Sequence, residues 1–172
     1  PRTSTVRSVE TTRFFVLSQV DFERLLVSSL GAEKIKTAVQ VGAFLKRNAL
    51  FADWHPQALM SLSNEFTFQD FHPKDVVIRE DQPNDSFYVV YEGQFEVRKK
   101  GTPCATLAPG DFCGEISLLR NTPATAEVAA VHSGRCLKLG KEKFLKFVSQ
   151  DFLTGLAIET ALETRFDRER AG

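Results

Sequence analysis

The 172-residue sequence has no excess of charge of either sign, because its 22 Lys and Arg residues balance its 22 Asp and Glu residues. Its longest run of like charges is Arg98-Lys99-Lys100. Long-range attraction to nucleic acid or to an anionic membrane depends on a charge imbalance that this composition does not have. Binding to DNA or to another polyanion is therefore not expected.

Long apolar runs and paired cysteines are missing as well. The longest apolar stretches, such as FFVL at 14–17, fall far short of the roughly 20 residues that cross a bilayer, so no membrane partner is predicted. Cys104, Cys113 and Cys136 show neither a CxxC spacing nor a nearby His at ligand spacing. A disulfide framework and a metal site are not indicated, and a reducing cytoplasm is the simplest location.

An internal repeat organises the chain. Residues 1–26 align without gaps on residues 123–148, at an offset of 122. In both copies two short alternating runs precede a brief helical pattern, which favours duplication over a chance similarity between two strand-strand-helix segments. The identical pairs are Pro1 with Pro123, Thr3 with Thr125, Val6 with Val128, Val9 with Val131, Arg13 with Arg135, Leu17 with Leu139 and Phe22 with Phe144.

The repeat predicts the domain organisation. Residues 1–30 are interpreted as the C-terminal remnant of a preceding domain, 31–48 as a connector helix and 49–172 as a nearly complete second domain. The chain begins at Pro1, with no initiating methionine and no signal segment, so it is interpreted as a piece of a longer protein. Phe14, Phe15 and Leu17 then lack the barrel on which they would pack, and residues 1–30 are expected to self-associate or to lie disordered.

Local signals place the helices. Ser18 and Asp21 form a weak capping signal for a helix that contains Phe22, and apolar residues at helical spacing continue from Ala32 to Asn48. His55 followed by Pro56 marks another helix start. Two further helical patterns lie at 141–149 and 152–168.

The apolar period changes to two in the central part of the chain. Short β-type runs lie at 66–71, 76–78, 87–91, 95–97, 104–107, 126–132 and 135–139. Turn signals such as QPND and APGD separate them. Many short strands with frequent turns are typical of a sandwich or a small barrel.

One segment is suited to holding a phosphate. APGDFCGEISLL, residues 108–119, combines a Pro109-Gly110 turn, Gly114 and a short helical run from Glu115 to Leu119. Free backbone N–H groups at a helix start attract anions, and a glycine there allows close approach. One turn and one glycine are a weak signal by themselves.

Combined with VVIREDQPNDSFYVVYEG (76–93) and PATAEV (123–128), this segment resembles the cyclic nucleotide-binding domain family from about Phe44 to Asp167. The resemblance implies an α+β, mainly β fold: a double-stranded β-helix (jelly-roll) barrel with flanking N- and C-terminal helices. Residues 110–128 then resemble the phosphate-binding cassette of the family. The implied ligand-binding residues are Asp85, Gly114, Glu115, Ile116, Ser117, Ala124, Thr125 and Ala126.

The resemblance also implies roles for these residues. Glu115 would hold the ribose 2′-hydroxyl, and Gly114 with neighbouring amides would meet the cyclic phosphate beside Ala126. Asp85 would orient the arginine with which the cassette usually ends. A base would be capped by Phe152 or Phe166, and the hinge would contain Phe144, Leu145 and Phe147.

The arginine position of the cassette is occupied by Ala124. Hydrogen bonds to charged groups contribute about 1.5–3 kcal/mol each, so losing a guanidinium lowers the affinity for a cyclic phosphate by roughly two to four decades. Lys74, Asp81 and Asn84 stand where the strand turns of the family have glycine, and Cys113 replaces an aromatic residue. The cassette is therefore predicted to be degenerate. Arg2 keeps the arginine in the first copy, but its partners would precede residue 1.

The sequence predicts a regulatory cyclic nucleotide-binding domain of a larger signalling protein, of the cAMP- or cGMP-sensing type, with weak or no binding of cyclic nucleotide. The alternatives are a domain that binds an uncharged ligand such as a nucleoside, and a structural or interaction barrel. Tandem copies resemble protein kinase A regulatory subunits, cGMP-dependent kinases and bacterial multidomain proteins, so the effector domain would lie outside this chain. No cofactor and no enzymatic activity are expected, because His55, His72 and His132 have no nucleophile and acid arranged near them.

Overall fold

The structure is a computed structural model that describes residues 5, 7–24, 31–48, 51 and 54–150. It comprises two compact units, the N-terminal unit Pro1–Lys36 and the barrel unit Thr37–Gly172, and each is described by itself. The predicted boundaries at residues 30 and 48 stay predictions.

In the N-terminal unit a single turn of helix, α1 (Gln19–Phe22), begins at Ser18, as the capping signal predicts. The Ser18 hydroxyl oxygen accepts the Asp21 N–H at 3.1 Å and donates to the Asp21 carboxylate at 2.6 Å. The alternating runs upstream were expected to be strand-like, and this is wrong for the described residues 7–17, which form neither helix nor strand. A strand requires a neighbour to accept its hydrogen bonds, and alternation alone does not supply one.

Helices in the described ranges 31–48 and 54–63 precede the barrel strands. Helix α3 (Ala32–Leu45) lies where apolar residues at helical spacing predict a helix, and it buries Ala38, Val41 and Leu45, whereas Val39 is exposed. Helix α4 (Pro56–Ser63) begins where His55-Pro56 predicts. The imidazole Nδ1 of His55 accepts the Gln57 N–H at the first turn of α4.

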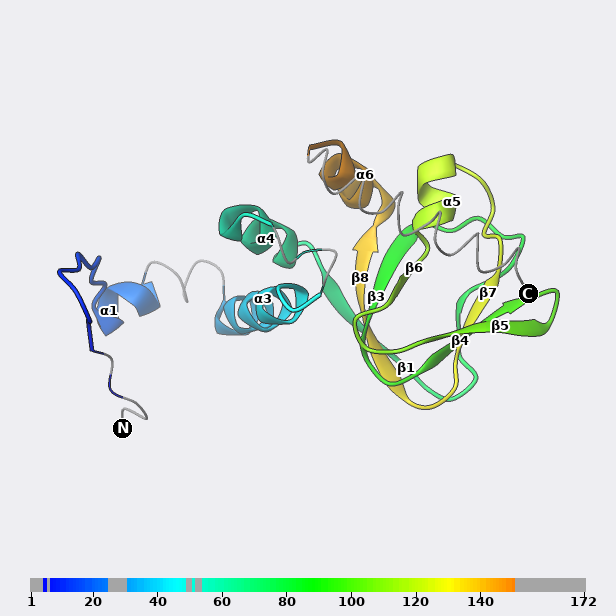
Figure 1. Cartoon of the computed structure of the whole chain (residues 1–172), viewed down its shortest axis with the longest axis horizontal. Coiled ribbons are helices and arrows are strands. Elements are labelled where there is room, and N and C mark those ends of the chain that lie inside the picture. The colour runs from blue at the N-terminus through cyan, green and yellow to red at the C-terminus, as the bar shows by residue number, and fades with distance from the viewer. Residues whose placement is uncertain (1–4, 6, 25–30, 49–50, 52–53, 151–172) are drawn as a thin grey trace. The chain divides into compact units, whose positions relative to one another are not determined.

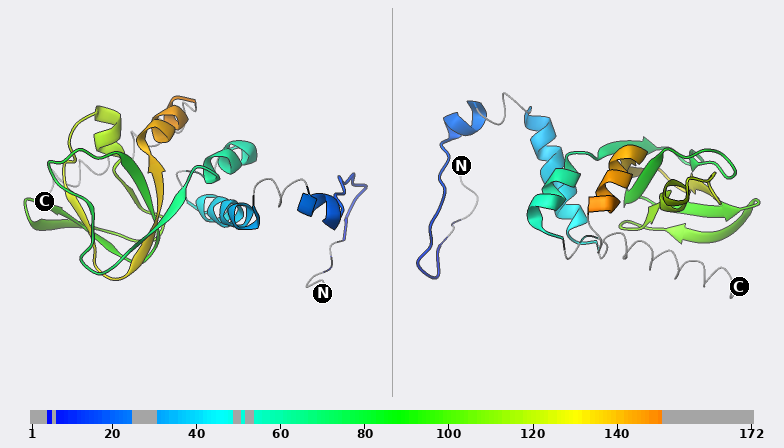
Figure 2. Two further views of the ribbon diagram at one scale, coloured as in Figure 1. Left: turned by 180° about the vertical axis from the view of Figure 1, so that it is seen from behind. Right: turned by 90° about the horizontal axis from the view of Figure 1, so that it is seen from above.

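Among the described residues, eight strands form two four-stranded antiparallel sheets, ordered β1-β8-β3-β6 and β2-β7-β4-β5. The two sheets face each other (Figures 1 and 2), which confirms the predicted mainly β, jelly-roll fold. The strands are β1 (Thr67–Phe71), β2 (Val76–Ile78), β3 (Ser86–Glu92), β4 (Phe95–Lys99), β5 (Thr102–Leu107), β6 (Phe112–Cys113), β7 (Glu127–Ala130) and β8 (Gly134–Gly140). The two-residue β6, which pairs with β3, was not predicted.

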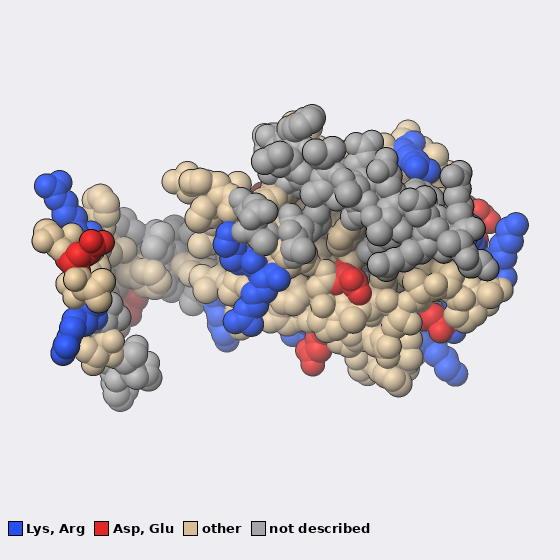
Figure 3. All heavy atoms as spheres, viewed as in Figure 1, with Lys and Arg blue, Asp and Glu red and all other residues tan. Residues whose placement is uncertain are grey.

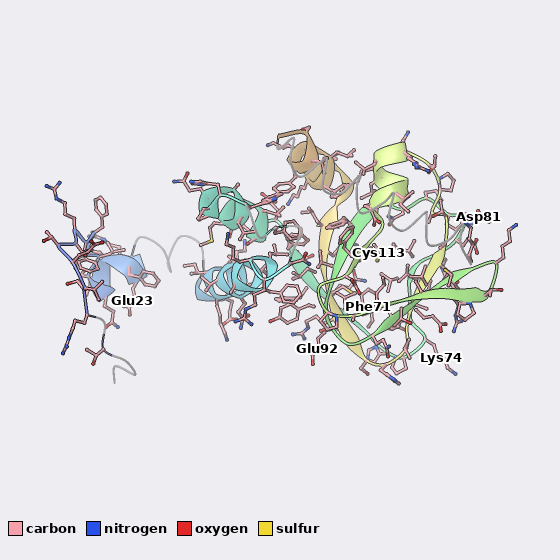
Figure 4. The ribbon with its side chains drawn as sticks, in the orientation of Figure 1. Glu23, Phe71, Lys74, Asp81, Glu92 and Cys113 are labelled. Atoms are coloured by element: carbon pink, nitrogen blue, oxygen red, sulfur yellow. The ribbon has the colours of Figure 1, made fainter. Side chains whose placement is uncertain are left out.

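The core has two parts because successive side chains of a strand point to opposite faces. Phe87 and Val89 of β3 join an outer cluster with residues of α3, α4 and α6. Tyr88 and Val90 join the inner cluster inside the barrel, which also contains Phe71 and Cys113 (Figure 4). The inner cluster consists of Phe71, Ile78, Tyr88, Val90, Phe95, Leu107, Cys113, Ala124, Val128, Ala130 and Cys136.

Helix α6 (Lys141–Gln150) follows β8 directly, close to the predicted range 141–149. The Phe144 ring stacks on Phe87 of β3, with ring centroids 4.7 Å apart. The Phe147 ring stacks on Trp54, the one tryptophan in the sequence, at 4.2 Å. The predicted helix at 152–168, and with it Phe152 and Phe166, lies outside the described residues.

The balanced numbers of basic and acidic residues are reflected on the surface. Basic and acidic side chains lie interspersed over the face shown in Figure 3. Within the described ranges, none of the helices has both the length and the apolar character that spanning a membrane requires.

Candidate functional site

The cassette, residues 110–128, contains the short helix α5 (Glu115–Arg120), which confirms the helical run expected there. Its N-cap is Gly114, with a φ of 92°. A Cβ at this position would lie 2.5 Å from the Ser86 carbonyl oxygen and 2.9 Å from the Asn84 Nδ2. Both the left-handed backbone and the close approach to β3 therefore require glycine.

Helix α5 carries polar side chains that the protein buries. Glu115 is 1% exposed and Ser117 is 4% exposed. Ile116 is partly buried and packs against the outer cluster, whereas Arg120 is exposed. Arg120, a conceivable substitute for the missing arginine, thus lies on the solvent side of the helix.

Ala124 is held by the turn between β2 and β3. Its N–H donates to the Gln82 carbonyl and its own carbonyl accepts the Asp81 N–H, both at 2.9 Å. Its side chain is 4% exposed and belongs to the inner cluster beside Ile78 and Val128. The arginine position of the cassette therefore presents a methyl group packed among apolar side chains.

The remaining residues expected at the site occupy different environments. Thr125 is exposed, and Ala126 is partly buried. Asp85 is exposed, and its Oδ1 accepts a hydrogen bond from the Ser86 hydroxyl at 2.7 Å. The carboxylate that the resemblance assigns to orienting an arginine thus bonds to the adjacent serine.

Asn84 makes contacts that the sequence did not reveal. Its Nδ2 lies within hydrogen-bonding distance of the Ser86 carbonyl (2.8 Å), the Ser117 hydroxyl (3.0 Å) and the Gly114 carbonyl (3.2 Å). The resemblance places it at one of three positions where the family has glycine, and of these three residues only Lys74 and Asp81 adopt positive φ, at 72° and 59°. No local pattern indicates a contact between residues 30 positions apart in the sequence.

Lys141, the first residue of α6, links the cassette to that helix. Its N–H donates to the Asp85 carbonyl at 2.8 Å, and its ammonium group donates to the Asn121 side-chain oxygen at 2.6 Å. Asn121 is the left-handed C-cap of α5. Asn121 of the cassette and Asp85, which precedes β3, thus both bond to the first residue of α6.

The cysteine and histidine side chains could in principle act as nucleophiles, bases or metal ligands, but Cys113, Cys136, His55 and His72 each contact or pack against neighbouring parts of the protein. Cys113 and Cys136 are buried in the inner cluster, and burial raises the pKa of Cys136 to about 12, so this thiol stays protonated. His55 caps α4, and His72 pairs with Asp75 on the surface. In the part of the chain that the structure describes, no three His, Cys, Asp or Glu residues gather as a metal site would require.

A jelly-roll barrel with a glycine-capped cassette helix defines a recognisable class of ligand-binding domain. The family model for the cyclic nucleotide-binding domain matches residues 68–151. Over 150 residues the chain is 31% identical to a cAMP-dependent protein kinase regulatory subunit from Yarrowia lipolytica, covering 86% of this chain and 39% of that subunit. Through residues 68–151 the chain belongs to the cyclic nucleotide-binding domain family.

Solved structures share the fold. The structure described as cAMP bound PfPKA-R matches with a TM-score of 0.77 at 17% identity, over 86% of this chain and 52% of that one. The regulatory subunit of a cAMP-independent protein kinase A from Trypanosoma brucei matches with a TM-score of 0.72 at 19% identity, over 88% and 54%. The chain thus spans about half of these solved chains and less than half of the curated relative.

Proposed function

We propose that the barrel unit is a regulatory domain of a larger signalling protein that binds cAMP or cGMP weakly or not at all. The burial of Ala124 in the inner cluster supports this proposal, because a cyclic phosphate needs a cation or several donors to replace its hydration. The carboxylates of Glu115 and Asp85 would repel the phosphate further.

The buried carboxylate of Glu115 supports a second candidate ligand, a nucleoside. A buried carboxylate can accept hydrogen bonds from the hydroxyls of a ribose. A nucleoside offers these hydroxyls without a phosphate charge, so it avoids the penalty that Ala124 imposes on a cyclic nucleotide. A neutral nucleoside is therefore the alternative ligand, and a barrel with only a structural role is the remaining alternative.

The link between the cassette and α6 supports a regulatory role without catalysis. A displacement of Asp85 or Asn121 changes the contacts of Lys141 and therefore the position of α6. Phe147 carries such a change to Trp54. The effector that responds lies outside this chain, and the cytoplasm is the proposed location, because the three cysteines show no spacing typical of a disulfide framework.

Calorimetric titration of the full chain with cAMP, cGMP and adenosine tests this proposal. The native chain should give no cyclic nucleotide signal at concentrations that saturate Ala124→Arg, since the guanidinium restores roughly two to four decades of affinity. Ala124→Met, of similar length but without charge, is the matched control and should stay silent. Micromolar cAMP binding by the native chain would overturn the proposal, and binding of adenosine alone would select the nucleoside alternative.

The thermal midpoint of the same variant provides a second readout. An arginine among the apolar side chains of the inner cluster is costly unless an anion pairs with it. Ala124→Arg should therefore unfold at a lower temperature than the native chain, and cAMP should reverse the shift. A variant that is destabilised and unaffected by cAMP would indicate that the cassette geometry itself cannot hold a cyclic phosphate.

A further inference from the structure

We infer that Asn84 is a positioning residue that holds the cassette helix α5 against β3 without any ligand. Its amide lies at the meeting point of three parts of the fold: the start of β3 at Ser86, the N-cap at Gly114, and Ser117 of α5. The inference concerns the geometry of the free domain, so it holds whether or not the domain binds a nucleotide.

The contacts of Asn84 are reciprocal. While Nδ2 donates toward Ser86 O, Gly114 O and Ser117 Oγ, the amide oxygen Oδ1 accepts the Ser86 N–H at 3.3 Å. The Ser117 hydroxyl in turn donates to the Gly114 carbonyl at 3.0 Å. Asn84, Ser117 and Gly114 therefore form a closed set of hydrogen bonds at the beginning of α5.

Burial makes these bonds important. Ser86 is 1% exposed, and Ser117 is 4% exposed, so water cannot readily replace a lost partner. The contact is also close, because a methyl group on Gly114 would meet both the Ser86 carbonyl and the Asn84 amide. The position of α5 on β3 is thus determined by both shape and hydrogen bonding.

Helix α5 depends on such support. It has 6 residues, fewer than an isolated helix needs to persist in water. Its own hydrogen bonds include Leu118 N–H to Gly114 O and Thr122 N–H to Ser117 O. Both acceptors belong to residues that Asn84 contacts, so loosening Asn84 should release these two amides first.

Hydrogen exchange on the full chain tests the inference. In Asn84→Asp the side chain keeps its size, but a carboxylate replaces the donor and faces three oxygen acceptors. The amides of Leu118 and Thr122 should exchange at least tenfold faster than in the native chain. The amide of Asn121 should do the same, because it also donates to the Ser117 carbonyl. Gln82→Glu is the matched control, since it adds the same charge to an exposed position in the same turn.

The amide of Leu137 on β8, whose side chain is fully buried, reports global opening in each variant. Selective acceleration in α5 with unchanged exchange at Leu137 supports a positioning role. If Asn84→Asp accelerates both regions, Asn84→Gly decides, because it removes the amide and adds no charge. Equal rates at residues 118, 121 and 122 in Asn84→Gly and the native chain would overturn the inference.

Discussion

At the scale of single residues, three positions where the family has glycine show that the residue type alone does not predict the backbone conformation or the side-chain contacts. Lys74 and Asp81 adopt positive φ although neither is glycine; the resemblance marked both as departures from the family's glycine turns, and their backbone geometry was not predicted. Asn84, the third of these departures, does not adopt positive φ. It instead uses its side chain, because its amide lies within reach of Gly114 and Ser117.

Cys136 provides a prediction on pH dependence. Its pKa is raised by burial from 9.0 to about 12 in the folded protein. Between these values the folded state keeps a proton that the unfolded chain releases, so the contribution of Cys136 to stability is complete below pH 9 and is lost as the pH rises toward 12.

We therefore expect Cys136→Val to lose less unfolding free energy than the native chain between pH 8 and pH 10.5, the range in which the unfolded thiol of about pKa 9 ionises. Urea unfolding at the two pH values measures the difference, and the other titrating groups cancel in the comparison. Cys104→Val is the control, because Cys104 is exposed. Identical pH dependences for the two variants would contradict the assignment.

At the scale of the elements, helices with a capping residue or an apolar helical pattern were predicted closely. Ser18 and His55 cap α1 and α4, and α5 and α6 lie where their apolar patterns indicate. Strand β6 was missed because two residues are too few for a period to be recognised. Strand β6 forms only because it pairs with β3, where Cys113 lies opposite Tyr88.

The start of α5 carries a second stability prediction. Gly114→Ala introduces both a left-handed alanine and a contact of 2.5 Å with the Ser86 carbonyl, which together should lower the unfolding free energy by roughly 2–4 kcal/mol. Gly101→Ala is the matched control: its φ is 77° but the space around it is open, so only about 1–2 kcal/mol of backbone strain is expected. Urea denaturation measures both variants. Equal losses would show that the approach of α5 to β3 is looser than the structure indicates.

At the scale of the whole chain, the repeat gives equivalent residues different surroundings. Leu139 and Phe144 of the barrel unit are 1% and 2% exposed, whereas Leu17 and Phe22 at the repeat positions are 50% and 40% exposed. Phe15, the equivalent of the fully buried Leu137, is fully exposed. This contrast supports the proposal that residues 1–30 belong to a preceding copy of the domain, whose barrel would cover them.

Association of the chain with itself tests the consequence of this exposure. The N-terminal unit displays Val9, Phe14, Phe15 and Val16 to solvent, and apolar surface of this kind favours association. Sedimentation of the full chain should therefore show concentration-dependent association, and a chain that begins at Gly31 should remain monomeric. The double variant Phe14→Ser and Phe15→Ser should behave like the shortened chain. A full chain that is monomeric at all concentrations would contradict this expectation.

The sequence by itself determined the features that depend on neighbouring residues. Alternation and turn residues predicted most strands, and capping residues predicted helix starts. The resemblance placed Ala124 where the cassette of the family usually has arginine, and this assignment stays a prediction. The tertiary structure alone decided which strands pair, such as Thr67 of β1 with Lys138 of β8, and that Ala124 packs into the inner cluster. It also brought Asn84 to Ser117. These contacts join residues far apart in the chain, so they are selected by the free energy of the complete barrel and leave no periodic signal in the sequence.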